Sequence, residues 1–389
     1  MDLEKLQEDF IRVFGEGGET SCYFAPGRVN LIGEHTDYNG GHVFPCALTI
    51  GAWAVVRPRE DRRLCLFSGN FPDQPKREIE IDGLTYRKED DWCNYPKGVL
   101  WAFQEAGYRP DHGLDILYQG NLPSSAGLSS SACIEVLTGK ILLDQFGWEM
   151  DGVRLALLAQ KAENRFNGVN CGIMDQFAIA MGKKDHAIFL DTADLSYSYV
   201  PLSLEGMRLV IACSNKKRGL ADSKYNERRE ECERALMQIQ KARDVKSLGE
   251  LNTEEFEALA DRIEDPVQRK RARHAVTENQ RTIQAVSALG RNDLELFGRL
   301  MNESHISLRD DYEVTGIELD TLVETAWKQP GVLGSRMTGA GFGGCTVSLV
   351  QEECVETFIR EVGKAYLEKI GYAADFYSVS MGEGPQKLS

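Results

Sequence analysis

Hydrophobic and polar positions follow two different patterns over the first two hundred residues of the chain. Short runs of β-branched and other apolar residues lie between turn-forming residues, and we predict strands there, at residues 49–56, 64–67, 114–118, 186–190 and 208–212. Apolar residues at helical spacing predict helices at residues 3–14, 127–146 and 151–166, and after Gly172. Asp151 stands where a helix N-cap is expected. This part of the chain therefore mixes strands with helices.

The second half begins with long charged helices, predicted from about residue 221 and over 266–289. It ends with a helix at 318–327, strands at 345–350 and 376–380, and a helix between those strands. The pattern is interrupted at 199–201, and no flexible linker follows. We therefore predict an α+β protein with two tightly packed domains, at residues 1–200 and 201–389.

Composition narrows the possible functions. The chain has 389 residues, 42% hydrophobic and 27% charged, which is typical of a globular protein. Its 45 Lys and Arg residues against 60 Asp and Glu give a net charge of -15, which opposes general binding to nucleic acid or to an anionic membrane surface. No uninterrupted apolar run reaches about 18 residues, so we expect no membrane span.

Cysteine spacing and the N-terminal residues indicate a cytoplasmic protein. The ten cysteines form no CxxC pair, and no histidine is spaced to complete a zinc site, so we expect reduced thiols. The first residues, MDLEKLQEDFIRVFG, carry acids where a secretory signal needs basic residues. We expect a surface helix there, and a monomer, although the sequence leaves an oligomer open.

The segment LPSSAGLSSSA at 122–132 has the composition of a phosphate-binding loop. Small residues let a backbone approach a ligand closely, and a helix that begins here would direct its unpaired N–H groups at an anion. An ordinary serine-rich N-cap is the alternative. Three consecutive hydroxyls at 129–131 exceed what one cap requires, and Glu163 on the next helix offers a carboxylate. A hydroxyl and a carboxylate, completed by nucleotide oxygens and water, would suit Mg²⁺.

Two further segments are candidates for ligand binding. The glycine-rich MTGAGFGGC at 337–345 precedes a predicted strand and would fold easily over a ligand, although by itself it is more typical of a turn. The segment APGRVNLIGEHTDYNGG at 25–41 concentrates polar side chains among glycines, and we interpret it as a loop. Short acceptors and a neutral imidazole suit the hydroxyls of a sugar, whereas a solvated turn is the simpler reading.

These three segments, in this order, resemble the three motifs of the GHMP kinases. GRVNLIGEHTDYNGG at 27–41 resembles the galactokinase signature in particular, as do NCGIMDQF at 170–177, SKYNERR at 223–229 and SLRDDYEVT at 307–315. The resemblance covers about residues 20–380. It implies ATP-dependent phosphorylation of the C1 hydroxyl of D-galactose, with an N-terminal half similar to the second domain of ribosomal protein S5. It also implies a C-terminal half of antiparallel sheet and helices, with the active site in the cleft between the two.

The resemblance also implies roles for individual residues. Asp175 matches the catalytic aspartate of the family, and Arg28 the arginine beside it and the transferred phosphate. The implied sugar-binding residues are Glu34, His35, Thr36, Asp37, Gly172 and Tyr225. The implied ATP-binding residues are Ser125, Ala126, Gly127, Leu128, Ser129, Ser130 and Ser131. Ser131 and Glu163 would hold Mg²⁺, and the loop at 339–344 would support the phosphates.

The sequence leaves two questions open. Asp175 would act either as the base for the C1 proton or as an electrostatic anchor, since a free aspartate, with a pKa near ~3.9, is a feeble base toward a hydroxyl. The substrate would be galactose or a related sugar such as N-acetylgalactosamine, galacturonate or arabinose. A third possibility is a regulator that binds galactose and ATP without turnover, and the presence of Ser131 and Asp175 argues against it.

Overall fold

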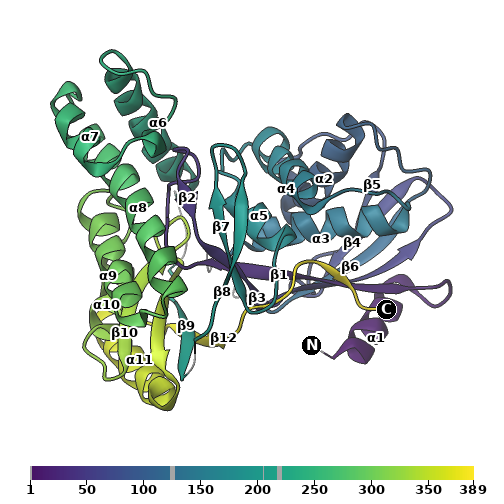
Figure 1. Cartoon of the computed structure of the whole chain (residues 1–389). Helices are drawn as coiled ribbons and strands as arrows, with labels where there is room; N and C mark the ends of the chain where they lie inside the picture. The colour runs from purple at the N-terminus through teal and green to yellow at the C-terminus, as the bar shows by residue number, and fades with distance from the viewer. Residues whose placement is uncertain (1, 123–127, 205, 217–220) are drawn as a thin grey trace.

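The computed structural model describes residues 2–122, 128–204, 206–216 and 221–389, which form two halves on separate sheets (Figure 1). The N-terminal half contains a six-stranded sheet with the order β13-β1-β3-β6-β4-β5. Its strands are β1 (Ser21–Asn30), β3 (Pro45–Pro58), β4 (Arg63–Ser68), β5 (Arg77–Glu80), β6 (Leu114–Gly120) and β13 (Gln386–Lys387). Strands β4 and β6 are parallel, and the other neighbours are antiparallel. The predicted strands at 49–56, 64–67 and 114–118 are confirmed.

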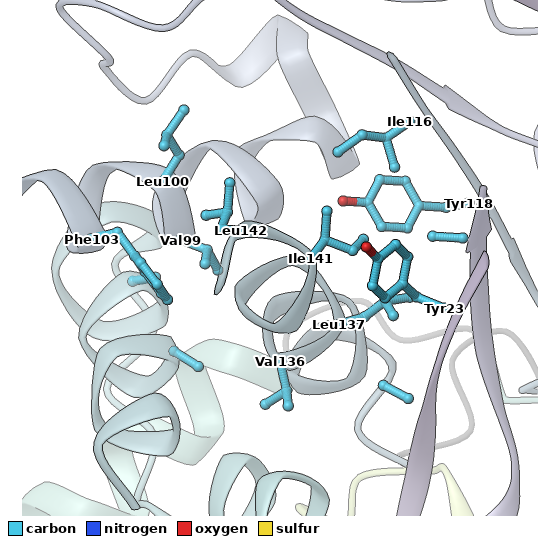
Figure 2. Packing of buried hydrophobic residues seen from close by; sticks show 14 of the residues in the cluster. Tyr23, Val99, Leu100, Phe103, Ile116, Tyr118, Val136, Leu137, Ile141 and Leu142 are labelled. Carbon is cyan, nitrogen blue, oxygen red and sulfur yellow. The ribbon is translucent and has the colours of Figure 1, made fainter. Parts of the chain in front are cut away.

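Helices cover both faces of this sheet. They are α1 (Leu3–Phe14), α2 (Asn94–Glu105), α3 (Ser130–Gln145), α4 (Gly152–Lys161) and α5 (Met174–Ala180), with a short 3-10 helix at Lys88–Cys93. Tyr23, which Figure 2 shows, and Ala54 belong to the core beneath α2 and α3, whereas Cys22 and Val55 pack against α1. Because both faces are buried, β3 carries a nearly continuous apolar run in place of an alternating one.

The helix predicted at 151–166 begins as expected but changes its winding. Asp151 is the N-cap, and its side chain accepts a hydrogen bond of 2.7 Å from the Arg154 N–H. After Lys161 the chain continues as a π-helical turn, Ala162–Asn167. Such π-helical turns are frequent at functional sites, and this one carries Glu163.

The C-terminal half contains a four-stranded antiparallel sheet with the order β10-β11-β9-β12. Its strands are β9 (Met207–Cys213), β10 (Val332–Thr338), β11 (Cys345–Gln351) and β12 (Asp375–Val379). Its helices are α6 (Ala221–Gln240), α7 (Thr253–Leu259), α8 (Pro266–Gly290), α9 (Leu294–Asp310), α10 (Gly316–Ala326) and α11 (Val355–Ile370), with 3-10 turns at Leu248–Glu250, Ala260–Arg262 and Glu352–Cys354. Helices α8 and α9 pack on one face, and α10 and α11 on the other.

A third, small sheet consists of β2 (His42–Val43), β7 (His186–Asp191) and β8 (Tyr197–Pro201), in the order β2-β7-β8. The sheets therefore confirm the predicted mixture of strands and helices in two halves. None of the described helices is long and apolar enough to cross a membrane.

The interpretation of residues 25–41 as a loop is wrong for their first six residues, which belong to β1. Pro26 and Gly27 suggested a turn, but the register of β1 against β3 shifts between Pro26 and Arg28, as at a β-bulge. Opposite Pro26 lies Gly51, where a Cβ would come within 2.0 Å of the Ala25 carbonyl oxygen. The bulge therefore fits inside the sheet because the facing residue has no side chain.

The glycine-rich loop at 339–344 connects two strands, β10 and β11, which are antiparallel neighbours. The sequence predicted the strand after the loop and missed β10 before it, because Gly334, Ser335 and Arg336 weaken its apolar pattern. Gly339, Gly341, Gly343 and Gly344 all have positive φ angles. Glycine is the residue that adopts this conformation without strain, so the composition of the loop follows from its geometry.

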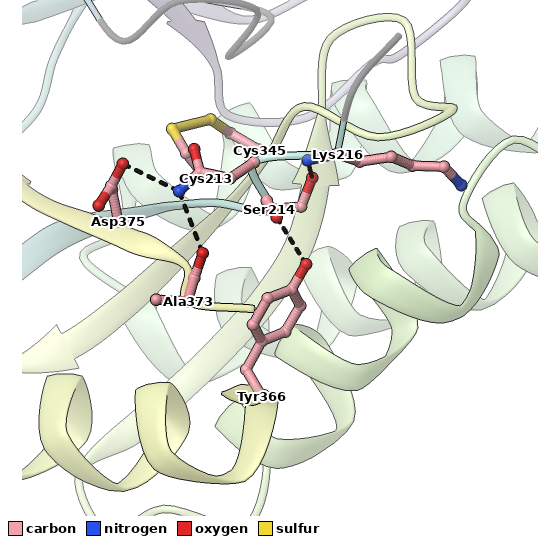
Figure 3. Close-up of a disulfide and its surroundings, with 8 residues drawn as sticks. Cys213, Ser214, Lys216, Cys345, Tyr366, Ala373 and Asp375 are labelled. Carbon is pink, nitrogen blue, oxygen red and sulfur yellow. Dashed lines mark hydrogen bonds between the residues drawn. A yellow bond between two sulfur atoms is a disulfide. The ribbon is translucent and has the colours of Figure 1, made fainter. Parts of the chain in front are cut away.

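The expectation that all ten cysteines are reduced is wrong for one pair. Cys213 at the end of β9 and Cys345 at the start of β11 form a disulfide, with their Cα atoms 4.3 Å apart (Figure 3). They are directly opposite each other in the antiparallel pairing. Their 132-residue separation in sequence concealed this proximity. The other eight cysteines are free.

The C-terminal residues join the two halves. After β12 the chain, yellow in Figure 1, returns to the N-terminal sheet and pairs there as β13 with β1. The Leu388 N–H donates to the Cys22 carbonyl at 2.7 Å, and the Cys22 N–H donates to the Ser389 carbonyl at 3.1 Å. The sheet of the first half is thus completed by the last residues of the second.

Arg57 offers a test of how α1 is held on the sheet. Its guanidinium donates to Asp115 Oδ2 at 2.8 Å and to the carbonyls of Phe14, Gly15 and Gly17. We expect Arg57→Met to lower the free energy of unfolding by about 1–3 kcal/mol, because hydrogen bonds to charged groups are lost at a mostly buried site. Urea denaturation measures this change, and an unaltered midpoint would show that α1 is held by its apolar contacts alone.

Candidate active site

A cavity of about 490 Å³ lies between the two halves. Most of the residues that line it belong to the N-terminal half, and Tyr225, Gly339 and Ala340 come from the C-terminal half. Seven of the eight residues predicted for catalysis or sugar binding also line it: Arg28, Glu34, His35, Asp37, Gly172, Asp175 and Tyr225. The structure therefore brings three separate sequence segments to one place.

Arg28 and Asp175 are in contact although they stand 147 positions apart. Arg28 follows the bulge of β1, and its Nε and Nη2 atoms both lie 2.8 Å from Asp175 Oδ1. Asp175 is in the first turn of α5, and its other oxygen, Oδ2, accepts a hydrogen bond from the Ser129 hydroxyl. The Arg28 side chain is 3% exposed, whereas that of Asp175 is 31% exposed. The carboxylate is thus held from behind and open to the cavity.

Asp37 packs directly against Gly172. A Cβ on Gly172 would lie 1.9 Å from Asp37 Oδ2, so a larger residue here would displace the carboxylate. The Met174 N–H donates to the same oxygen at 3.4 Å. Burial, and second the nearby charge of Asp175, raise the pKa of Asp37 to about 7. The requirement for glycine at 172 has a clear steric cause.

Aromatic rings enclose His35. Its ring centroid lies 4.8 Å from that of Tyr312 and 5.6 Å from that of Tyr225, and Nδ1 is 2.7 Å from the Tyr38 hydroxyl. Burial lowers the pKa of His35 to about 3, so the imidazole is neutral. A neutral imidazole among tyrosines suits polar ligand groups better than it suits an anion.

Thr36 does not line the cavity, unlike its neighbours. It is fully buried, and its hydroxyl lies 2.9 Å from the Gly33 carbonyl oxygen and 2.7 Å from that of His42. These contacts stabilise the turn after β1. This backbone turn carries Glu34, His35 and Asp37, which line the cavity.

The predicted ATP-binding residues are placed in different ways. Ser130 and Ser131, at the start of α3, line the cavity. Ser129 is the N-cap of α3, with a φ of 59°, and its hydroxyl donates a hydrogen bond to Asp175. The side chain of Leu128 is buried in an apolar cluster. Ser125, Ala126 and Gly127 lie outside the described residues.

Glu163 is at the bottom of the cavity and is surrounded by polar groups. Gln176 Nε2 donates to Glu163 Oε2 at 2.7 Å and to Glu135 Oε2 at 3.1 Å, so one amide group contacts two buried carboxyl groups. Burial, and second the charge of Asp175, raise the pKa of Glu163, while a hydrogen bond from Ser131 lowers it. Ser131 and Glu163, predicted as a pair, are therefore neighbours at the cavity wall.

Sequence reasoning missed an apolar arm of the cavity. Aromatic and aliphatic side chains from several segments line it: Phe71, Trp92, Tyr95, Tyr118 and Ile134. Trp92 follows Asp91, a residue with a φ of 45°. A tryptophan within the acidic run KEDDWCNY was the available signal, but nothing in the sequence linked it to the other four residues.

Family models agree with this assignment of segments. A galactokinase galactose-binding signature matches residues 8–58, the GHMP kinases N terminal domain matches 94–183, and the GHMP kinases C terminal model matches 285–368. Together they include Arg28, Asp37, Glu163 and Asp175 from the cavity.

The chain is similar to full-length relatives over nearly the whole length of both sequences. The chain is 57% identical over 387 residues to the galactokinase of Clostridium beijerinckii, which covers 100% of this chain and 99% of the relative. It is 54% identical over 385 residues to the galactokinase of Bacillus subtilis, with 99% of both chains covered.

Solved structures show the same relationship. The crystal structure of Lactococcus lactis galactokinase complexed with galactose is similar with a TM-score of 0.97 and 49% identity, over 99% of this chain and 100% of that one. Mevalonate kinase of Methanococcus jannaschii, at 19% identity and a TM-score of 0.68, shares the fold, over 95% of this chain and 100% of that chain. With its identity to these relatives over nearly its whole length and the signature segments gathered at one cavity, this chain belongs to the galactokinase family of the GHMP kinase superfamily.

Proposed function

We propose that the chain transfers the terminal phosphoryl group of ATP to the C1 hydroxyl of D-galactose in this cavity. The contact between Arg28 and Asp175 is the observation that carries the proposal. It combines a cation and a proton acceptor beside Glu34, His35 and Asp37, the residues of the sugar signature. Phosphoryl transfer requires positioning and charge stabilisation more than covalent chemistry from the protein. The galactose complex of the Lactococcus lactis relative supports the choice of sugar.

Asp175 is the proposed catalytic residue for the sugar hydroxyl. Arg28 and Ser129 each occupy one of its oxygens and fix its orientation, which favours a geometry ready for reaction. Arg28 would also stabilise charge on the transferred phosphoryl group. If Asp175 acts as a base, removal of its carboxylate should lower the rate more than if Asp175 acts only as an electrostatic anchor.

The sugar would lie among the residues of the aromatic and acidic side of the cavity. Glu34, Asp37 and the neutral His35 supply acceptors for hydroxyl groups, and Tyr225 supplies an apolar ring face and a hydroxyl. Gly172 would leave room for Asp37. Thr36 would act on the sugar through the shape of the turn, since its hydroxyl contacts the chain's own backbone.

The remaining arm of the cavity would hold ATP. Its aromatic and aliphatic walls, which include Trp92 and Ile134, suit the flat adenine ring. The helix N-terminus with Ser130 and Ser131 lines the cavity, and its N–H groups would favour phosphate. Ser125 to Ser129 and the glycine-rich loop at 339–344 are proposed to complete the phosphate contacts.

The charges of the cavity favour a divalent cation. Glu163, Asp175 and Asp37 all line it, and repulsion from Asp175 contributes to the raised pKa of both other carboxyl groups. Ser131 and Glu163 fit Mg²⁺, which prefers one or two carboxylates with hydroxyl, phosphate and water oxygens. When bound, the ion would neutralise charge on the ATP phosphates.

Three broader proposals complete the picture. Division into domains 1–200 and 201–389 is supported by β8 and β9, which belong to different sheets on either side of residue 201.

A cytoplasmic location is supported by eight free cysteines, whereas the Cys213–Cys345 disulfide argues against it. Thiol titration of the freshly purified, denatured protein distinguishes eight thiols from ten. The monomer stays a prediction, which sedimentation tests.

The function is tested by ADP release with ATP and Mg²⁺ over a panel of sugars, with the phosphorylated position assigned by NMR. Galactose should be preferred to glucose by a large factor, since a site that hydrogen-bonds one hydroxyl rejects its epimer. Preference for N-acetylgalactosamine, galacturonate or arabinose would favour a related sugar kinase. Binding of galactose and ATP without ADP release would favour the regulator.

Asp175→Asn keeps the size of the side chain and removes its charge and its proton acceptor. We expect kcat to fall about 10²-fold or more if Asp175 is a base, while calorimetry still detects galactose binding. Arg28→Ala should also lower kcat, and the double variant should lose less than the product of the two effects because the residues act together. Parallel losses of melting temperature, affinity and activity would instead identify the pair as a structural salt bridge.

Glu163→Gln tests the proposed metal site. We expect the Mg²⁺ affinity, measured by calorimetry with a non-hydrolysable ATP analogue, to fall at least about 10-fold, the range seen when groups that support a metal ligand are lost. Glu356→Gln, at an exposed position of α11, is the matched control and should bind as the unaltered protein does. Equal Mg²⁺ affinity in both variants would place the ion elsewhere.

Asp37 makes the stability of the ligand-free protein depend on pH. Folded Asp37 keeps its proton up to about pH 7, whereas the unfolded group loses it near its ordinary pKa of 3.8. Between these values the folded state binds more protons, so stability decreases as the pH rises. Asp37→Asn should flatten this decrease by about 1 kcal/mol or more, and the surface variant Asp73→Asn should not. Urea denaturation across the interval measures both, and parallel profiles would contradict the assignment.

A further inference from the structure

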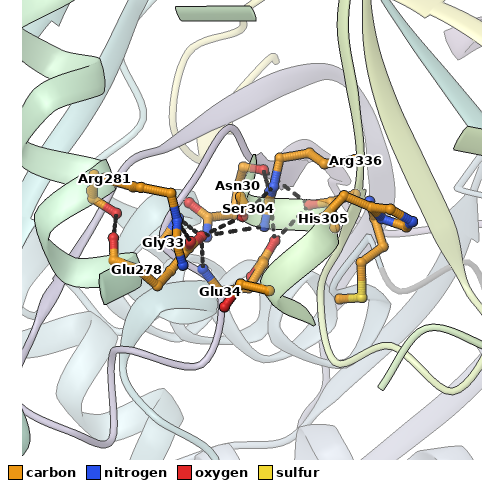
Figure 4. A network of polar contacts seen from close by, with 12 residues as sticks. Asn30, Gly33, Glu34, Glu278, Arg281, Ser304, His305 and Arg336 are labelled. Carbon is orange, nitrogen blue, oxygen red and sulfur yellow. Dashed lines mark hydrogen bonds and ion pairs between the residues drawn. The ribbon is translucent and has the colours of Figure 1, made fainter. Parts of the chain in front are cut away.

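Arg336 is a fully buried arginine that the motifs do not explain. It lies near the end of β10, three positions before the glycine-rich loop, and its side chain has no exposed surface. A buried guanidinium is stable only when its charge and its donors are matched. It forms ion pairs with Glu34 and Glu278, two carboxylates that come from different parts of the chain (Figure 4).

Two of the three side-chain nitrogens of Arg336 are hydrogen-bonded, and the third, Nη2, faces a carboxylate beyond hydrogen-bond distance. Nη1 donates to Glu34 Oε1 at 3.3 Å and to the Asn30 carbonyl at 3.1 Å. Nε donates to the Ser304 hydroxyl at 3.1 Å, and Nη2 lies 3.8 Å from Glu278 Oε1. Glu278 is itself paired with Arg281 at 2.8 Å. The guanidinium therefore connects the end of β1 to α8, α9 and β10.

Glu34 uses its two oxygens differently. Oε1 accepts hydrogen bonds from Arg336, from the Thr338 hydroxyl at 3.0 Å and from the Gly339 N–H at 2.8 Å. None of the residues that the structure describes donates a hydrogen bond to Oε2, and Glu34 lines the cavity. Three donors on one oxygen prevent the carboxylate from rotating. The second oxygen is thus left for a ligand.

We propose that Arg336 is a positioning residue that holds Glu34 so that Oε2 receives one particular hydroxyl of the sugar. The inference rests on the proposed function, since it requires a polyol in the cavity. A fixed acceptor binds a hydroxyl without losing side-chain freedom at the moment of binding. Arginine suits the task because its planar donors contact Glu34, Asn30 and Ser304 at once, which the single ammonium group of lysine does not reproduce.

The experiment compares the affinity of galactose with that of each monodeoxygalactose, measured by calorimetry. The unaltered protein should bind the deoxy sugar that lacks the hydroxyl bound by Glu34 about 10-fold to 100-fold more weakly than it binds galactose. This is the range for a hydrogen bond to a charged group. The Glu34→Gln variant identifies that hydroxyl, because the difference in affinity between galactose and that one deoxy sugar should be smaller in this variant. Arg336→Lys should reduce discrimination at the same hydroxyl, with the other deoxy sugars affected as in the unaltered protein.

Two further variants keep the test decisive. Thr338→Val removes one donor to Oε1 without leaving a buried charge unpaired, so it should fold even if Arg336→Lys does not. It should reduce the same discrimination by a smaller factor. Arg57→Met removes a mostly buried arginine that contacts α1 and Asp115, far from Glu34 in the fold, and should leave discrimination unchanged.

The outcomes separate the inference from the proposed function. An unaltered protein that binds no galactose contradicts the function. Galactose binding with an equal loss for every deoxy sugar in Arg336→Lys and Thr338→Val overturns the positioning role and leaves the function intact. So does a change at a hydroxyl that Glu34→Gln does not affect.

Discussion

Repulsion among carboxyl groups is the constraint on which the cavity depends. Asp37, Glu163 and Asp175 line it together with Glu34, and Glu135 lies just beneath. Such groups would separate or take up protons if nothing opposed their charges. Arg28 binds one oxygen of Asp175, Arg336 binds one oxygen of Glu34, and the Gln176 amide donates to both Glu163 and Glu135. Arg28 and Ser129 thereby fix both oxygens of Asp175, whereas Glu34 is fixed through one oxygen and its other oxygen is left for a ligand.

Residues of both halves take part in this arrangement. Arg28 is on β1 of the first sheet, Arg336 on β10 of the second, and Asp175 on a helix between them in sequence. Glu34 joins the two systems, since its backbone continues from β1 and its side chain binds β10 and the Gly339 N–H. The position of the glycine-rich loop and that of the turn after β1 are therefore set by a shared carboxylate.

The sequence allowed much of the fold to be predicted where burial follows one period. The helices α3, α4 and α8 and the strand β3 carry long apolar patterns that few alternatives match. Strand β1 was missed because a bulge, made possible by Gly51 on the neighbouring strand, places Pro26 and Gly27 inside a sheet. The Cys213–Cys345 pair was missed because strand register, which is not local information, brings the two residues together.

The polar part of the site was easier to predict than its supports. Arg28 and Asp37 come from the motif at 25–41, which concentrates polar side chains among glycines, and Asp175 comes from the segment at 170–177 that resembles galactokinases. The apolar arm and Arg336 come from segments with ordinary compositions, and only the folded chain gathers them. Thr36 shows the converse, since a residue inside a motif can serve the backbone of its own turn.

One measurement tests most directly whether Asp175 is the residue that meets the sugar. It is a crystal structure of the chain with galactose, Mg²⁺ and a non-hydrolysable ATP analogue. We predict that the C1 hydroxyl is within hydrogen-bonding distance of the Asp175 carboxylate, with Arg28 still on Asp175 Oδ1 and the terminal phosphate near both the hydroxyl and the Arg28 guanidinium. A C1 hydroxyl that points away from Asp175, with another hydroxyl in its place, would contradict the assignment.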